Sequence, residues 1–280
     1  MKNVLGIGTA GCNIVEQLSK YNVYTPYYMS NIYKRSTKNK FAVPYEDSPE
    51  KYETRELPKL EAWLEKLKNN CTVFLCGASD SSALVLRVLE ILHRNKNKIE
   101  VVCFVPEVEV LSETKALHER TVRGVLQNYA RSGLLSKMTL ISNYLLEKSA
   151  TNTNVYDYYK QINEVFVGTY YMMDVFKNTA PVISTHKKPN EVCRISTIGI
   201  SSLGESEDTL FFPIKNDREV VYYYGINETK LREHENLFRS ITEKVKTKIT
   251  ESRKVSFGVY STQYEEDYIY AESFSSEIQE

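Results

Sequence analysis

Short apolar runs alternate with amphipathic segments along the first half of the chain. Apolar runs of about four to eight residues are typical of strands buried on both faces, whereas apolar residues three or four positions apart are typical of helices that cover a sheet. Strands are predicted at 4–7, 23–29, 72–76, 99–105 and 138–141, and helices at 14–21, 57–68, 81–93 and 113–132. This order predicts an α/β fold whose parallel sheet is covered by helices on both faces. The polar stretch 33–54 is expected to be a long surface loop.

A different pattern begins after residue 150. Apolar residues at helical spacing predict one long helix from Asn154 to about Asn178, which at 1.5 Å per residue spans roughly 37 Å. Pro181 and Pro189 break the pattern. Beyond them, strands are predicted at 193–200, 220–225, 255–261 and 268–274, with one helix at 230–249. Strands around one principal helix indicate a small α+β domain with a mixed sheet.

Composition excludes several classes of protein. The 280 residues suffice for one large domain or two modest ones, and Lys plus Arg and Asp plus Glu number 36 each, so no overall field favours nucleic acid or an anionic membrane. No apolar run approaches the roughly 20 residues of a membrane span, and no signal peptide is visible, so we expect a soluble, cytoplasmic protein. The five cysteines and four histidines are scattered without metal-site spacing, and no metal site is expected.

A glycine-rich turn follows the first predicted strand. Gly6, Gly8 and Gly11 let the backbone turn sharply and approach an anion, while the free N–H groups of the next helix supply positive potential. The spacing fits G-x-G-x-x-G, which is typical of dinucleotide sites. Such a site needs an acidic residue about 20 residues further on. The second predicted strand instead ends at 30–32 without an acid.

Two alternatives follow from this turn. An NADP site stays open, because Lys34 and Arg35 would hold a 2′-phosphate. An NAD(P)-dependent oxidoreductase on a Rossmann-like domain is therefore one alternative, although no Tyr-x-x-x-Lys pair and no His with an acidic partner is placed to handle a proton. The other alternative is a tight strand-to-helix turn without a ligand, because a single glycine motif is weakly specific.

Two stretches of the chain resemble the tubulin/FtsZ superfamily. The segment 6–13 is similar to the first phosphate loop of that family, which ends in Cys-Asn or a similar pair. The segment 62–92 follows the family's order of helix, strand, signature loop and helix without a gap. The resemblance implies a tubulin/FtsZ-like α/β fold with a Rossmann-like parallel-sheet domain. The nucleotide-binding candidates in the first loop are Gly6, Gly8, Thr9, Ala10, Gly11, Cys12 and Asn13.

The signature loop departs from the family pattern. In the family it reads Gly-Gly-Gly-Thr-Gly-Ser/Thr-Gly, and its backbone wraps the phosphates; here 76–82 read Cys-Gly-Ala-Ser-Asp-Ser-Ser. The added side chains crowd a phosphate, and Asp80 brings negative charge to the site. Either Asp80 lowers GTP affinity, or it caps the following helix and its carboxylate occupies the anion site. The nucleotide-binding candidates in this loop are Gly77, Ala78, Ser79, Asp80 and Ser81.

Three more candidates come from the resemblance. Asn143 stands where the family approaches the sugar or base, and Asn163 on the long helix matches a residue that contacts guanine, whose edge an amide can pair with. Asn163 is otherwise an ordinary exposed helix residue. In the loop after the long helix, family acids position water in the next subunit's site. Within the corresponding segment 184–191 only Glu191 is acidic, so Glu191 is the catalytic candidate.

The resemblance also implies a division of the chain and a function. The division is a tubulin-like GTPase-type domain at 1–153, a long central helix at 154–180, a small α+β C-terminal domain at 181–271 and an acidic tail at 272–280. The chain is expected to assemble with itself head to tail into filaments. GTP or GDP is the expected cofactor, with Mg²⁺ only if GTP is bound. The degenerate loops imply weak or absent GTP binding and reduced or lost hydrolysis.

Two further expectations concern partners and origin. The alternative within the family is a pseudo-GTPase adaptor that does not polymerise. The chain is similar in size to compact bacteriophage tubulin-like proteins, some of which latch neighbouring subunits with an acidic tail, and this similarity implies the host cytoplasm as its location. No nucleic-acid or membrane partner is expected.

Overall fold

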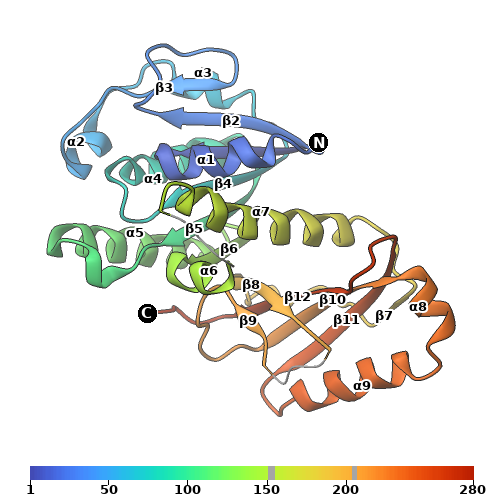
Figure 1. Ribbon diagram of the computed structural model, residues 1–280. Helices are drawn as coiled ribbons and strands as arrows, with labels where there is room; N and C mark the ends of the chain where they lie inside the picture. The colour runs from blue at the N-terminus through green and yellow to red at the C-terminus, as the bar shows by residue number, and fades with distance from the viewer. Residues whose placement is uncertain (151–154, 204–206) are drawn as a thin grey trace. The chain divides into compact units, whose positions relative to one another are not determined.

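The computed structural model describes residues 1–150, 155–203 and 207–280. The chain forms two compact units, Met1–Val167 and Gly168–Glu280 (Figure 1). Helix α7 (Tyr158–Lys177) begins in the first unit and ends in the second. The long predicted helix is therefore present, although its expected start at Asn154 lies outside the described residues. No helix in the described ranges is long and apolar enough to span a membrane.

A parallel sheet forms the centre of the first unit. Its strands are β1 (Lys2–Ile7), β2 (Tyr24–Ser30), β3 (Lys40–Ala42), β4 (Asn70–Cys76), β5 (Lys98–Val105) and β6 (Lys137–Ser142). They lie in the order β3-β2-β1-β4-β5-β6, and each neighbouring pair is parallel. All the strands therefore end at the same edge of the sheet, where parallel α/β sheets hold their ligands. The α/β expectation for this half is confirmed.

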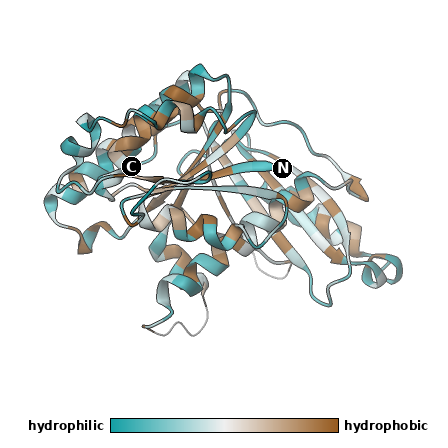
Figure 2. Ribbon diagram, turned by 90° about the horizontal axis from the view of Figure 1, so that it is seen from above, coloured by the Kyte–Doolittle hydropathy of each residue, from teal (hydrophilic) through white to brown (hydrophobic). Residues whose placement is uncertain are grey.

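Helices connect the strands of the first unit. They are α1 (Gly8–Leu18), α2 (Pro49–Thr54), α3 (Leu60–Leu64), η1 (Asp80–Leu84), α4 (Val85–Arg94), η2 (Val108–Val110), α5 (Glu113–Ser132) and α6 (Asn143–Ser149). Helix α5 has the predicted bounds, because Ser112 accepts a hydrogen bond from the N–H of Lys115 at one end and Gly133 turns left-handed at the other. Figure 2 shows hydrophobic residues on many of the central strands, whereas hydrophobic and hydrophilic residues alternate along the helices.

Four predictions in this unit are wrong in detail. The helix expected at 14–21 is α1, which begins at Gly8 directly after β1 and ends at Leu18, so Gly8 and Gly11 lie within the helix. The expected surface loop 33–54 contains β3 and α2, and α2 contacts η1. Tyr52 is the buried residue of α2, and a single apolar anchor produces no periodic pattern. The helix expected at 57–68 shortens to α3, and the one expected at 81–93 begins as the 3₁₀ segment η1 before it becomes α4.

A mixed sheet forms the centre of the second unit. Its strands are β7 (Ile183–Ser184), β8 (Ile195–Ser201), β9 (Thr209–Leu210), β10 (Glu219–Asn227), β11 (Lys254–Thr262) and β12 (Tyr268–Ser275). Strands β10 and β11 are parallel, whereas β12 runs antiparallel to β10 and β8, and β7 runs antiparallel to β11. The helix expected at 230–249 is divided into α8 (Glu228–Glu233) and α9 (Leu237–Lys248). The α+β expectation is otherwise confirmed.

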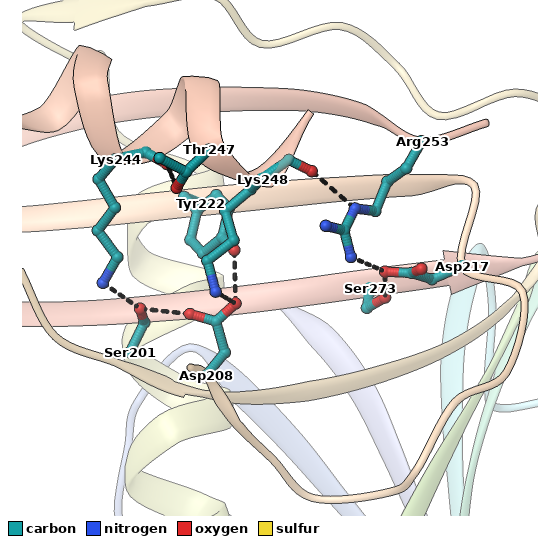
Figure 3. A network of polar contacts seen from close by, with 9 residues as sticks. All are labelled: Ser201, Asp208, Asp217, Tyr222, Lys244, Thr247, Lys248, Arg253 and Ser273. Carbon is teal, nitrogen blue, oxygen red and sulfur yellow. Dashed lines mark hydrogen bonds and ion pairs between the residues drawn. The ribbon is translucent and has the colours of Figure 1, made fainter. Parts of the chain in front are cut away.

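Helix α9 is fixed to the second sheet by apolar and polar contacts. Ile241 and Val245 of α9 join a buried cluster with Tyr222, Tyr224 and Phe257. A polar network lies beside this cluster (Figure 3). Its centre is Asp208, which accepts hydrogen bonds from Ser201 Oγ at 2.7 Å, Tyr222 Oη at 2.5 Å and Lys248 Nζ at 3.1 Å.

The end of the chain is not the tail that the sequence predicts from residue 272. Residues up to Ser275 belong to β12, and Glu272 is 2% exposed and pairs with Lys177 at 2.6 Å. Gln279 is equally buried, and its side chain accepts from the N–H of Lys215 at 2.6 Å and donates to the Lys215 carbonyl. These segments pack within their own unit because each polar group finds a partner there.

Candidate functional site

The glycine-rich turn joins β1 to α1 at the carboxyl edge of the first sheet. Gly8 has φ +72°, a left-handed conformation that residues with a Cβ rarely adopt. A Cβ on Gly8 would also lie 2.6 Å from Ser81 Oγ. The turn therefore requires glycine at this position for two reasons, and the first loop faces the signature loop here.

The other two glycines of the turn allow close packing. A Cβ on Gly11 would lie 2.1 Å from the Phe74 carbonyl oxygen of β4, and one on Gly6 would lie 2.5 Å from the Gly11 carbonyl carbon. Cys12 is buried and its Sγ donates to the Gly6 carbonyl at 3.4 Å. Burial raises the pKa of the Cys12 thiol to about 11. Gly6, Gly11 and the Cys12 side chain thus hold α1 against the sheet.

The start of α1 is open to an anion. Ile7 occupies the N-cap position, and no side chain caps the helix there. Thr9, Ala10 and Asn13 are exposed on this first turn. The first N–H groups of an α-helix have no partner within the helix, and the dipole of an 11-residue helix adds positive potential at this end. The turn therefore has the geometry of an anion cradle.

The signature loop, 76–82, adopts a backbone that does not require glycine. No residue of 76–82 has a positive φ. Three of its N–H groups are already used: Gly77 donates to the Phe104 carbonyl, Ser79 to that of Cys76, and Ser82 to that of Ser79. Gly77, the glycine of this segment, lies close to helix α5, since a Cβ there would be 3.2 Å from Glu119 Cγ. Ala, Ser and Asp fit the remaining positions without backbone strain.

Two serine hydroxyls lie between the first loop and the signature loop. Ser79 Oγ and Ser81 Oγ are 2.9 Å apart, and both approach the position that a Cβ on Gly8 would take. Hydroxyl groups donate and accept hydrogen bonds. They can donate to a phosphate oxygen, or they can fill the cradle without one.

Asp80 is the first residue of η1 and not its N-cap. Ser79 occupies the N-cap position, without a capping hydrogen bond from its side chain. The expectation that Asp80 caps this helix is therefore wrong, because the helix starts one residue earlier than the sequence pattern predicts. Asp80 is half-buried, and its charge lies in the loop that faces Gly8.

Helix α5 supports the signature loop with residues that the sequence analysis missed. His118 Nε2 lies 2.9 Å from Ser82 Oγ and 3.2 Å from the Ser79 carbonyl. Arg123 Nε donates to Glu119 Oε1 at 2.7 Å, and both side chains are buried. Glu119 and Arg123 stand four positions apart, a spacing that usually indicates an exposed helical pair. Only the tertiary structure identifies this pair as buried.

The asparagine candidates lie apart from the two loops. Asn143 begins α6 directly after β6, and Asn163 lies half-buried on α7. Within the described residues no hydrogen bond joins either side chain to the loops. Gln17 Nε2 donates to the Lys160 carbonyl at 3.3 Å, which holds α1 against α7 near Asn163. Tyr159, four positions before Asn163 and 68% exposed, is a ring on the same helix face that the sequence analysis missed.

Glu191 belongs to the second unit. Its side chain is 80% exposed and lies 3.8 Å from Lys188 Nζ. Glu191 and the two loops therefore belong to different units. Within the described ranges, no three His, Cys, Asp or Glu side chains gather as metal ligands would.

The fold was compared with known proteins. No protein-family model and no curated protein sequence matches the chain. GDP-form protofilaments of Bacillus thuringiensis serovar israelensis TubZ match with a TM-score of 0.72 and 10% identity over 97% of this chain and 83% of that chain. The empty FtsZ dimer of M. jannaschii matches with a TM-score of 0.69 and 12% identity over 98% and 88%. The GTPγS-bound protofilament of Haloferax volcanii CetZ2 matches with a TM-score of 0.71 and 8% identity over 98% of this chain and 92% of that chain.

These similarities extend over both units. The identities are too low to carry an activity, but each match covers at least 97% of this chain with a TM-score of 0.69 or more. The chain therefore has the fold of the tubulin/FtsZ superfamily.

Proposed function

We propose that the chain is a tubulin-like subunit that assembles head to tail and binds a guanine nucleotide weakly through the turn between β1 and α1. The observation that supports this proposal is that α1 begins at the left-handed Gly8 without a side-chain cap. The fold is also shared with proteins that were solved as protofilaments. TubZ was solved in a GDP form and CetZ2 with GTPγS. The cytoplasmic location and the bacteriophage origin stay predictions.

The proposed nucleotide contacts divide among four elements. The first N–H groups of α1 bind phosphate, and the hydroxyls of Ser79 and Ser81 donate to it in place of the lost glycine amides. Asn143 at the start of α6 approaches the sugar. On α7, Asn163 pairs with the guanine edge, and the ring of Tyr159 stacks on the base. Mg²⁺ enters only with GTP.

Hydrolysis is proposed to be slow. Asp80 adds negative charge to the site, where the charge of a triphosphate must also go. Glu191, the acid of the segment 184–191, orients water in the site of the next subunit. It is a single carboxylate, whereas the family uses several, so hydrolysis is slow. A nucleotide-free scaffold and a non-polymerising adaptor are the competing outcomes.

The first test is high-speed pelleting over a series of protein concentrations, with and without GTP, with negative-stain images of the pellets. We expect filaments to pellet above a threshold concentration only when GTP is present. Filaments that pellet equally without nucleotide would indicate a pseudo-GTPase scaffold. The absence of any assembly would favour the adaptor.

Two glycine variants separate the nucleotide site from general stability. Gly8→Ala forces a Cβ into a left-handed turn and against Ser81 Oγ, so we expect GTP affinity to fall at least about tenfold. Gly124→Ala is the matched control, because nothing lies within 4 Å of its added Cβ. Equal GTP affinity in both variants, measured by calorimetry, would contradict the proposed site.

A further inference from the structure

His186 packs into a site on the second sheet, called the seat below, that is formed by Tyr222, Tyr223 and Tyr260. It follows β7 and lies inside the segment 184–191 that contains Glu191. Its Nε2 lies 3.2 Å from the Tyr222 carbonyl, and its Nδ1 lies 3.3 Å from Tyr260 Oη. The imidazole centroid is 5.1 Å from that of Tyr223. Both ring nitrogens are therefore engaged, and the ring packs against an aromatic face.

Gly258 provides the space for this ring. A Cβ on Gly258, in the middle of β11, would lie 2.7 Å from His186 Cε1. Gly258 pairs with Ser184 in the ladder between β11 and β7, so the seat lies directly beside the start of the segment. Glycine in the interior of a strand weakens the strand, and close approach of another group is a physical reason for it.

The imidazole is the last contact that holds the segment before it leaves the sheet. Thr185 donates its N–H to the Phe257 carbonyl at 2.8 Å. The His186 N–H donates to Ser184 Oγ at 2.9 Å within the segment, and among the described residues the next backbone N–H that bonds to the sheet is that of Asn190, which donates to Glu219 Oε1 at 3.0 Å. Lys187 and Lys188 lie between these two points, so the position of His186 sets the path of the exposed segment.

The seat favours a neutral imidazole. A neutral ring donates from Nε2 to the Tyr222 carbonyl and accepts from Tyr260 Oη at Nδ1. Burial lowers the pKa of His186 below its usual value; the hydrogen bond with the Tyr222 carbonyl raises the pKa in part, and the nearby Lys177 ammonium lowers it. Lys177 is paired with Glu272 and lies 5.5 Å from the centroid of Tyr223. The phenols of Tyr223 and Tyr260 also face the imidazole, whereas the Tyr222 phenol donates to Asp208.

We propose that His186 is a latch that fixes the segment 184–191 in its assembly-competent form, and that protonation of the imidazole releases the segment. The inference rests on the proposed function, because it makes this segment one side of the contact between copies. The latch has its full effect above the ordinary imidazole pKa near 6.5. The stabilisation of the segment 184–191 by the neutral imidazole decreases progressively as the pH falls through the lowered pKa of His186.

Three variants test the latch through the threshold concentration for pelleting at pH 7.5 and pH 5.5. For the wild-type protein we expect the threshold to rise about tenfold at pH 5.5, as it does when only a tenth of the copies are competent. His186→Gln keeps a neutral donor for the Tyr222 carbonyl, so its threshold should stay low at both pH values. His186→Ala should have a high threshold at both. The matched control is His234→Gln, which changes an exposed histidine of the same unit and should follow wild type.

Hydrogen exchange of the peptide 183–192 gives a readout that does not depend on assembly. Below the pelleting threshold, exchange in His186→Ala at pH 7.5 and in wild type at pH 5.5 should exceed that in His186→Gln at the same pH. Equal exchange in all three overturns the latch, as does acid sensitivity that survives in His186→Gln. If exchange changes as expected while wild type never pellets, the latch stands as a contact within the chain, but its link to assembly and the proposed function both fail.

Discussion

At the scale of single residues, Gly8 and Asp80 have opposite effects on an anion. Gly8 keeps the first loop open beside the uncapped start of α1. Asp80 lies between Ser79 and Ser81 in the signature loop, and its carboxylate forms no hydrogen bond or ion pair with the described residues. A carboxylate without a partner cation repels phosphate more strongly as the site loses water.

Asp80→Gly is therefore expected to raise GTP affinity about tenfold or more. The backbone there has an ordinary φ, so the loop does not need the change for its shape. Asp80→Asn is the matched control, since it removes the charge and keeps the size, and it should have the same direction of effect. Calorimetric titration with GTP measures both variants. Unchanged or lower affinity in both would show that the carboxylate does not face phosphate.

At the scale of elements, Asp208 joins two strands and a helix of the second unit. The partners of its carboxylate come from β8, β10 and α9 (Figure 3). Burial by itself raises the pKa of Asp208, but hydrogen bonds from Ser201 and Tyr222 and the Lys248 ammonium outweigh it and leave the pKa below its usual value. The folded state thus favours the charged form. Arg253 extends the network, donating to the Lys248 carbonyl at the end of α9 and pairing with Asp217.

Asp208→Asn should lower the free energy of unfolding by about 3 kcal/mol at pH 7, because it removes the half-buried carboxylate that pairs with Lys248 Nζ. The native contribution is present above the unfolded pKa near 3.9 and is lost as the pH falls through the lowered folded pKa. Urea unfolding at pH 7 and at pH 3 should therefore show a smaller difference between variant and wild type in acid. Glu243→Gln, at an exposed ion pair on the same helix, is the control and should cost about 0.5 kcal/mol or less.

At the scale of the whole molecule, the proposed contact joins two different surfaces. The first unit carries the loops around Gly8, and the second unit carries the segment 184–191. Two different surfaces that bind each other produce an open chain of copies unless the rotation closes a ring. Every filament then exposes the first-unit surface at one end and the second-unit surface at the other. The addition of a subunit requires both surfaces.

Lys188→Glu tests this polarity. The exposed Lys188 lies in the segment 184–191, so a variant copy should join a filament through its first unit and then stop further addition at its second. With one variant copy per ten wild-type copies, we expect a mean length of about ten subunits in negative-stain images. Lys246→Glu, on the exposed face of α9, should leave filament length unchanged. Variant copies that are simply left out, with normal filament length, would argue against a polar contact.

Local signals explain which elements were predictable. The strands of the first unit are short apolar runs, and α5 has a serine cap and a terminal glycine, so both follow from neighbouring residues. Helix α2 and strand β3 were missed because one buried residue and a three-residue strand leave no period to detect. The separation of α8 from α9 was missed because the helical pattern continues through the break at 234–236.

The candidate site was predictable only in its first loop. The order of strand, glycines and helix determined a left-handed Gly8 and a helix start without a side-chain cap, because the positive φ and the free N–H groups are properties of the local chain. Only the tertiary structure decided that Gly11 serves packing against Phe74, that α5 supports the signature loop with His118, and that Gly258 provides space for His186. These contacts join residues far apart in the sequence. Their pairing depends on strand register and on the packing of helices against the sheet, which the spacing of apolar residues along one segment does not encode.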